Sequence, residues 1–204
     1  MTKYFNKKQK GFTLVEMMVA IAVFSVVMVV AATALLSIID ANKKSQAIKT
    51  AINNLNFALE GISKDVRMGT NYQCLDDTAD SNGNCPGTGG QSFKYRSTRA
   101  YKSNGIYGFA YYRYDPTTQS IQSCLEKTSD IDCSLDSNFF PLTSEEIRIT
   151  NAKFYIVGNG SELDIPKLQP RVVIIIEGES GNQAKIKTTF DLQTSVSQRT
   201  RFNN

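Results

Sequence analysis

The chain of 204 residues contains no histidine. Without an imidazole it has neither a Ser-His-Asp triad nor a histidine acid–base pair, and no glycine-rich phosphate loop follows a predicted strand. The carboxylates also lack any spacing that is typical of a catalytic pair. The sequence therefore indicates a protein that is not an enzyme, needs no cofactor and has no metal centre.

Acidic residues are absent from the first ten positions, which contain Lys3, Lys7, Lys8 and Lys10. Over the whole chain 23 basic residues exceed 19 acidic ones, which gives a net charge of +4. The four lysines account for this excess, so the remaining chain is close to neutral. Net charge therefore gives no general reason to expect nucleic-acid binding.

Charged residues are also absent from residues 17–39, where only Ser25, Thr33 and Ser37 are polar. At about 1.5 Å per residue a helix of this length reaches roughly 34 Å and can cross a bilayer core of about 30 Å. The short lysine-rich leader favours a cytoplasmic N-terminus, although lysines after residue 42 weaken the asymmetry. We therefore expect a single-pass protein of the cytoplasmic membrane.

Glu16 lies at the edge of this apolar segment, where a carboxylate costs about 2.5 kcal/mol or more toward the helix centre. The pattern Thr13-x-x-Glu16 matches a capping box, which by itself accounts for an acid at a helix start. The functional alternative to the capping box is that Glu16 also pairs with a positive group of another molecule. Cleavage after Gly11 would give Phe12 a free amine, and that cation would pair with Glu16 of a neighbouring molecule.

The sequence KGFTLVE at residues 10–16, followed by an unbroken apolar helix, resembles the class III signal of type IV pilins and type II secretion pseudopilins. The resemblance implies that a prepilin peptidase cleaves after Gly11, that Phe12 becomes the N-methylated first residue and that Glu16 sets the subunit register. It also implies assembly with other pilin or pseudopilin subunits, from the cytoplasmic membrane into a cell-surface or periplasmic filament. A secretory signal peptide ending near Ala34 is the alternative, but the apolar run continues past that site.

After Asp40 the apolar residues recur at spacings of three and four, which predicts an amphipathic helix that ends near Gly69. We expect its stripe to pack against a globular domain. The stripe consists of Ile48, Ile52, Leu55, Leu59, Ile62 and Val66.

The four cysteines, Cys74, Cys85, Cys124 and Cys133, form two close pairs in the sequence. Outside the cytoplasm disulfides persist, and three connectivities are available. We favour Cys74 with Cys85 and Cys124 with Cys133, because each bond would close a local polar loop. A zinc site is the alternative, but the chain has no Cys-x-x-Cys and no histidine.

Glycine, proline and asparagine crowd residues 71–92, which are therefore predicted as a loop. The loop also contains oxygen ligands suited to calcium, although the pattern of an EF-hand is broken at Thr78 and no downstream glutamate closes it. A solvated acidic loop is the favoured interpretation, and calcium binding is the alternative. The side chains concerned are Asp76, Asp77, Asp80, Asn82 and Asn84.

Six later segments are predicted as strands, at 93–95, 107–114, 121–124, 146–157, 171–177 and 184–197. A turn at residues 115–118 makes 107–124 a hairpin, and residues 172–176, apolar on both faces, predict an inner strand. The expected fold class is α+β, a long N-terminal helix packed on an antiparallel sheet in the ladle shape of pilins. The expected parts are a leader at 1–11, a membrane and filament-core helix at 12–39, an amphipathic half at 40–69 and a β-rich extracytoplasmic domain at 70–204.

The second half of the chain narrows the resemblance to the minor subunits of these filaments. Residues 154–157, Gln169-Pro170-Arg171 and residues 192–199 are similar to minor pilins and J-type minor pseudopilins. The membrane half of the helix also lacks the glycine or proline of many major pilins, which favours a minor subunit.

Basic and aromatic residues alternate over residues 93–114, with no acid before Asp115. Such a surface suits single-stranded nucleic acid or an anionic glycan, and the chain would then be a DNA-capturing subunit of a competence pilus. The competing interpretation is an ordinary pair of strands with its basic residues on the solvent-exposed face. The candidate contact residues are Arg96, Arg99, Lys102 and Arg113.

Overall fold

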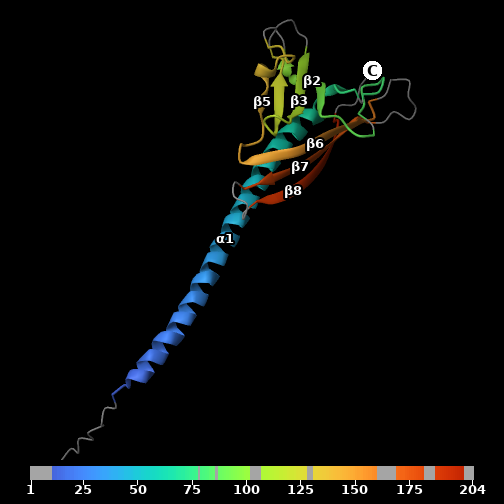
Figure 1. Cartoon of the computed structure of the whole chain (residues 1–204). Coiled ribbons are helices and arrows are strands. Elements are labelled where there is room, and N and C mark those ends of the chain that lie inside the picture. The colour runs from blue at the N-terminus through green and yellow to red at the C-terminus, as the bar shows by residue number, and fades with distance from the viewer. Residues whose placement is uncertain are drawn as a thin grey trace, which may run out of the picture. The chain divides into compact units, whose positions relative to one another are not determined.

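The structure is a computed structural model that describes residues 11–77, 79–85, 87–101, 107–127, 131–159, 169–181 and 187–199 (Figure 1). The expected leader at residues 1–10 lies outside these ranges, as does Lys102. The chain divides into two compact units, Met1–Lys43 and Lys44–Asn204. Helix α1, Leu14–Arg67, contributes to both.

In the first unit every described side chain is exposed. In the second unit α1 turns one face into the core, and this face consists of Ala51, Leu55, Ala58, Ile62 and Val66.

The predicted stripe is therefore partly wrong. Ile52 is 42% exposed, and Ile48 and Leu59 are only partly buried. Ala51 and Ala58 belong to the buried face instead, because a helix with small side chains can approach the sheets more closely than one with isoleucine there.

Two antiparallel sheets follow the helix, where the sequence predicted one. The first has the order β1-β2-β3-β4-β5, and its strands are Thr70–Cys74, Ser92–Tyr101, Tyr107–Asp115, Ser120–Leu125 and Phe140–Pro141. A short 3-10 helix, Asp136–Asn138, precedes β5. The second sheet has the order β6-β7-β8, and its strands are Ile147–Val157, Arg171–Ser180 and Thr188–Ser197.

Strand β1 lies inside the segment predicted as a loop, and β2 is much longer than the predicted 93–95. β1 is short, and its Asn71 has a φ of 55°, a conformation that interrupts a regular strand. Its strand character comes from pairing with β2, so the local sequence does not reveal it.

The predicted hairpin is confirmed, because β3 and β4 pair in register from Ala110 with Leu125 to Asp115 with Ser120. The Asp115 carboxylate holds the turn by accepting hydrogen bonds from the Thr117 N–H at 2.8 Å and the Thr118 hydroxyl at 2.7 Å. Strand β7 is the predicted inner strand, since β6 and β8 pair with it on either side.

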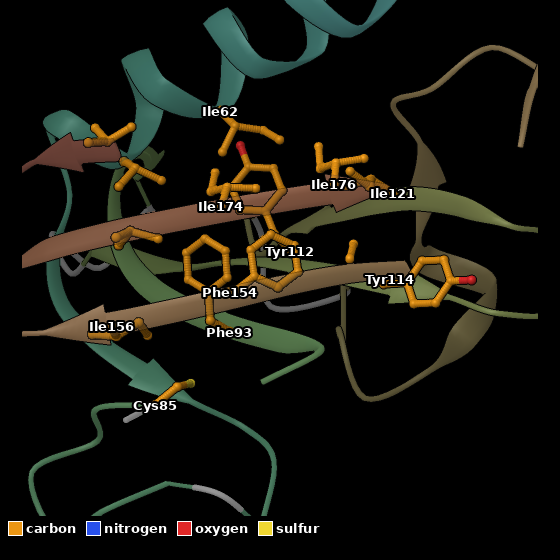
Figure 2. Close-up of a cluster of buried hydrophobic side chains, with 14 of the residues drawn as sticks. Ile62, Cys85, Phe93, Tyr112, Tyr114, Ile121, Phe154, Ile156, Ile174 and Ile176 are labelled. Carbon is orange, nitrogen blue, oxygen red and sulfur yellow. The ribbon is translucent and has the colours of Figure 1, made fainter. Parts of the chain in front are cut away.

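The core lies between the buried face of α1 and the inner faces of the sheets (Figure 2). Alternate residues of β2, β3, β6 and β7 point into it, as the two-residue period of a strand requires. Aromatic rings fill its centre, with the ring centroids of Phe93 and Phe154 4.9 Å apart and those of Phe93 and Tyr112 5.6 Å apart. The labelled members are Ile62, Cys85, Phe93, Tyr112, Tyr114, Ile121, Phe154, Ile156, Ile174 and Ile176.

The C-terminal end of α1 is fastened to both sheets. The buried Tyr72 hydroxyl on β1 lies 2.5 Å from the Val66 carbonyl and 2.9 Å from the Gly69 carbonyl. Just after β8, the Arg199 N–H donates to the Arg67 carbonyl at 2.8 Å. The Arg67 carbonyl, which the helix end leaves without a partner in the helix, is thus satisfied by a tertiary contact.

Candidate functional site

The start of α1 is held by a reciprocal pair of side chains. The Glu16 carboxylate accepts hydrogen bonds from the Thr13 N–H at 2.9 Å and from the Thr13 hydroxyl at 3.0 Å. In return, the Thr13 hydroxyl accepts from the Glu16 N–H at 3.3 Å. This is the predicted capping box. It satisfies Glu16 with neutral donors, and within the described residues no cation is paired with the carboxylate.

Gly11 precedes this cap in open space. No described atom lies within 4 Å of the Cβ that an added side chain would have, and its φ is not in the left-handed region. The fold of the described chain therefore places no demand for glycine at position 11. Phe12 beside it is 83% exposed, so both residues are accessible to another molecule.

The apolar segment after Glu16 has no partner among the described residues. Residues 17–39 are all exposed, including its large side chains. Two of its polar residues are satisfied within the helix, because the Ser25 hydroxyl donates to the Ile21 carbonyl at 2.8 Å and the Thr33 hydroxyl to the Val30 carbonyl at 2.9 Å. By length and composition α1 can cross a membrane.

Comparison with protein families adds the deciding observation. The Prokaryotic N-terminal methylation motif matches residues 6–32, which include Gly11, Phe12 and Glu16. The chain carries the class III signal of type IV pilins and pseudopilins. The motif implies processing of this pilin-like chain by a prepilin peptidase and assembly with other pilins. Neither the search of curated proteins nor that of solved structures gave a match.

Both disulfides of the pilin-like chain have the pairing that the sequence favours. Cys74 is bonded to Cys85 with Cα atoms 5.6 Å apart, and Cys124 is bonded to Cys133 with Cα atoms 5.8 Å apart. The cysteine side chains are largely or wholly buried. With all four thiols consumed, they are not available as ligands for a zinc ion.

The acidic loop uses its carboxylates to hold its own backbone. Asp80 accepts from the N–H groups of Asn82 and Asn84, at 2.9 and 2.8 Å. Burial raises the pKa of Asp80, but the hydrogen bonds from Asn84, Asn82 and Gly83 together outweigh it, so the pKa is lowered. Asp76 accepts from the Gln91 N–H and from the Ser92 hydroxyl. The described residues contain no cluster of three acids or cysteines that would hold a metal ion, so the calcium alternative gains no support.

The aromatic residues of 93–114 divide between two faces, and Phe109 and Tyr111 lie on the outer one beside Lys94. Phe93, Tyr95, Tyr112 and Tyr114 are buried in the core, so their rings cannot stack on nucleic-acid bases. Burial raises the pKa of the Tyr112 hydroxyl, which keeps it neutral.

The predicted contact residues are mostly engaged within the chain. Arg99 is paired with Asp65, and Arg113 is paired with Asp136. The Arg113 guanidinium also lies 3.8 Å from the Phe139 ring centroid. Arg96 is exposed beside Phe109, with 5.8 Å between its guanidinium and that ring. The three described candidates therefore do not form a common free basic surface, and a nucleic-acid partner is not supported.

Sequence reasoning missed Asp65, which connects α1 to the first sheet. Its carboxylate is paired with Arg99 of β2 and accepts a hydrogen bond from the Tyr112 hydroxyl of β3 at 3.2 Å. The available signal was an acid on the flank of the apolar stripe, directly before Val66. Acids on a helix flank are common and usually solvated, so the position alone does not identify the contact.

Proposed function

We propose that the chain is a minor structural subunit of a type IV pilus or a type II secretion pseudopilus. A prepilin peptidase cleaves after Gly11, and Phe12 becomes the methylated first residue. The subunit then moves from the cytoplasmic membrane into a filament, where its apolar helix packs against the helices of its neighbours. The match of the methylation motif over residues 6–32 carries this proposal.

Two features of the structure support the cleavage step. Gly11 lies in open space with an ordinary φ, so the described fold does not need a glycine there. We therefore attribute the glycine to recognition by the peptidase. Phe12 is exposed, which leaves the bond between the two residues accessible.

Besides capping α1, Glu16 has a second role, which is in assembly. Its capping contacts with Thr13 are made by neutral groups, so the full negative charge remains. In hydrocarbon such a charge is costly, and the methylated amine of Phe12 on the next subunit neutralises it. Because only one stagger brings the two charges together, the pair selects the register between subunits.

The globular unit would present surfaces to other subunits, and we propose no catalytic activity for it. A minor position in the filament is supported by the similarity of residues 154–157 and 192–199 to minor pilins and J-type pseudopilins. It is also supported by the unbroken course of α1, in which no proline interrupts the membrane half.

Mass spectrometry of the mature protein from cells with and without the prepilin peptidase tests the proposal. We expect an N-methylated Phe12 at the N-terminus in the first case and an intact leader in the second. The variant Gly11→Val should stay uncleaved, and because position 11 has no neighbours within 4 Å its fold should be unchanged. A mature chain that begins after Ala34 would instead identify a secretory signal peptide and refute the proposal.

A further inference from the structure

Two sheets present four outer edges, and three of these are closed or blunted. The β5 edge has two residues, and Pro141 there has no N–H to offer. On the β1 edge the Cys74 N–H donates to the Gly83 carbonyl at 2.8 Å, and the Asn159 side chain donates to the Tyr72 carbonyl at 2.6 Å. Neither strand offers a row of free backbone groups.

The β6 edge is closed by loops that belong to the first sheet. Phe154 and Gly90 exchange both backbone hydrogen bonds at 2.8 Å. The Cys85 N–H donates to the Ile156 carbonyl at 3.1 Å. These contacts leave β8 as the one remaining outer strand among the described residues (Figure 1).

The direction of the backbone groups on β8 follows from one contact. The Gln198 N–H donates to the Pro170 carbonyl at 2.9 Å, so residue 198 faces β7. Because N–H and C=O groups alternate in direction along a strand, the odd-numbered residues face away from β7. We call their backbone groups the β8 edge; the residues are Thr189, Asp191, Gln193, Ser195 and Ser197.

The β8 edge is long and regular. The pairing of β7 with β8 continues over ten positions without a register shift. β8 contains no proline and no lysine, which are the residues that usually protect an exposed edge from pairing. No backbone hydrogen bond from residues 189–197 to a described residue outside the sheet is found. The β8 edge is therefore ready to receive another strand.

The core is also incomplete beside this edge. Phe190 and Leu192 point toward the core but are only partly buried, whereas Ile174 and Ile176 on β7 are almost completely buried. A further strand would cover the exposed parts of both side chains, provided that its inward residues are apolar.

The charges on the outward face of β7 and β8 indicate which side chain an added strand should carry there. Glu177 and Asp191 lie directly opposite each other in the β7–β8 register. Pairs of this parity do not exchange backbone hydrogen bonds, which brings their side chains close together, and like charges in such a pair are destabilising. No lysine or arginine among the described residues is paired with either carboxylate. A cation opposite Asp191 would relieve this repulsion.

We propose that the β8 edge binds an extended strand of a neighbouring, different pilin-like subunit, with apolar residues facing Phe190 and Leu192 and a lysine or arginine facing Asp191. This inference rests on the proposed function for its partner. A second copy of this chain is disfavoured, because its own outer strands β1, β5 and β8 contain no lysine and no arginine. The strand addition itself is a general mode of recognition at open sheet edges.

Hydrogen exchange with residue-level resolution, on the full mature chain in detergent and in sheared filaments, tests the inference. On assembly the amides of Thr189, Asp191, Gln193 and Ser195 should exchange more slowly, by on the order of a hundredfold. Amides of Phe190 and Leu192 already face β7 and serve as internal controls.

Three variants provide a second measurement, which is the amount of chain in the filaments. Gln193→Pro removes an outward N–H and should lower incorporation about tenfold, while the fold persists because edge positions tolerate proline. Gln193→Thr keeps the N–H and is the matched control, with normal incorporation expected. Asp191→Lys should also reduce incorporation, since it would repel the partner's cation.

The outcomes separate the inference from the proposed function. If the chain enters filaments but the outward β8 amides exchange as fast as in detergent, strand addition is wrong and the filament role stands. If the processed chain never enters filaments, both are wrong. Protection of the β8 amides in the purified chain alone, rising with its concentration, would identify a second copy as the occupant and overturn the choice of partner.

Discussion

The Asp65 carboxylate on α1 is paired with the Arg99 guanidinium on β2, and the Tyr112 hydroxyl donates to the same carboxylate. The Asp65 side chain is 14% exposed and that of Arg99 is 60% exposed. The acid is thus the more enclosed partner, and it depends on both contacts. This pair connects the last turns of the helix to the first sheet.

Replacing Asp65 should therefore destabilise the protein. We expect Asp65→Asn to lower the free energy of unfolding by about 1–3 kcal/mol, because a charge-assisted hydrogen bond in a partly buried site is lost. Denaturant unfolding of the full chain in detergent measures the change. Asp136→Asn is the matched control, since its carboxylate is 86% exposed and paired with Arg113, and its effect should stay below about 1 kcal/mol. Equal effects of the two changes would contradict this assignment.

Glu16→Gln should separate the two roles of that residue. An amide oxygen can still accept the hydrogen bonds from Thr13, so the cap at the helix start should largely persist. The negative charge is lost, and incorporation into filaments should fall about tenfold or more, equivalent to 1.4 kcal/mol or more of pairing energy. Quantitative immunoblots of membrane and filament fractions give the readout. Normal incorporation of the glutamine variant would leave capping as the whole function of Glu16.

Two glycines near the end of α1 should respond to alanine in opposite ways. A Cβ at Gly69 would lie 2.2 Å from Cδ2 of Tyr95, so Gly69→Ala should cost about 1–3 kcal/mol of stability. A Cβ at Gly61 meets nothing within 4 Å, and Gly61→Ala should stabilise the helix by up to about 1 kcal/mol. Thermal unfolding of both variants and the parent measures whether the two changes in stability have opposite signs. A stabilising Gly69→Ala would show that the Tyr95 ring can move aside.

Acid should weaken the β3–β4 turn through Asp115. Partial burial opposes its ionisation, but the hydrogen bonds from Thr118 and Thr117 outweigh this and hold the pKa of Asp115 below its ordinary value of 3.8. A carboxyl group with a lowered pKa in the folded state adds stability above the unfolded pKa, and this stability is lost as pH falls through the folded value.

The free energy of unfolding should therefore decrease from about pH 5 toward pH 2, and it should decrease less in Asp115→Asn. Denaturant unfolding at intermediate pH values compares the two proteins. Parallel curves for parent and variant would show that Asp115 does not contribute to the pH dependence. Thr117→Val keeps the hydrogen bond from the backbone N–H but loses the one from the Thr117 hydroxyl, so its pH dependence should lie between those of the parent and Asp115→Asn.

The start and the extent of α1 could be predicted closely from the sequence. Thr13 and Glu16 form the expected cap, and the helix is continuous from Leu14 to Arg67. These features are local, because capping depends on residues three apart and helical periodicity on residues within two turns. The disulfides were also predictable, since short loops between cysteines favour local pairing.

The remaining differences come from interactions between distant segments. The 3.6-residue period allowed Ile52 and Ala51 equally, and only the position of the sheets decided that the alanine faces inward. The two-residue period over 93–101 predicts two rows of side chains on opposite faces of the strand, but it does not indicate which row enters the core. Tyr95 and its neighbour Phe93 are buried, and this placement removed part of the apparent aromatic surface, of which Phe109 and Tyr111 remain on the outer face.

The fastening of Val66, Arg67 and Gly69 by Tyr72 and Arg199 has a mechanical consequence. Traction applied along the helix reaches the globular unit through two anchor points, one on each sheet. Such a load is shared between β1 and the segment after β8, so the hydrogen bonds at both places must break before the end of α1 separates from the globular unit. A pull on the helix therefore does not act on a single connecting loop alone.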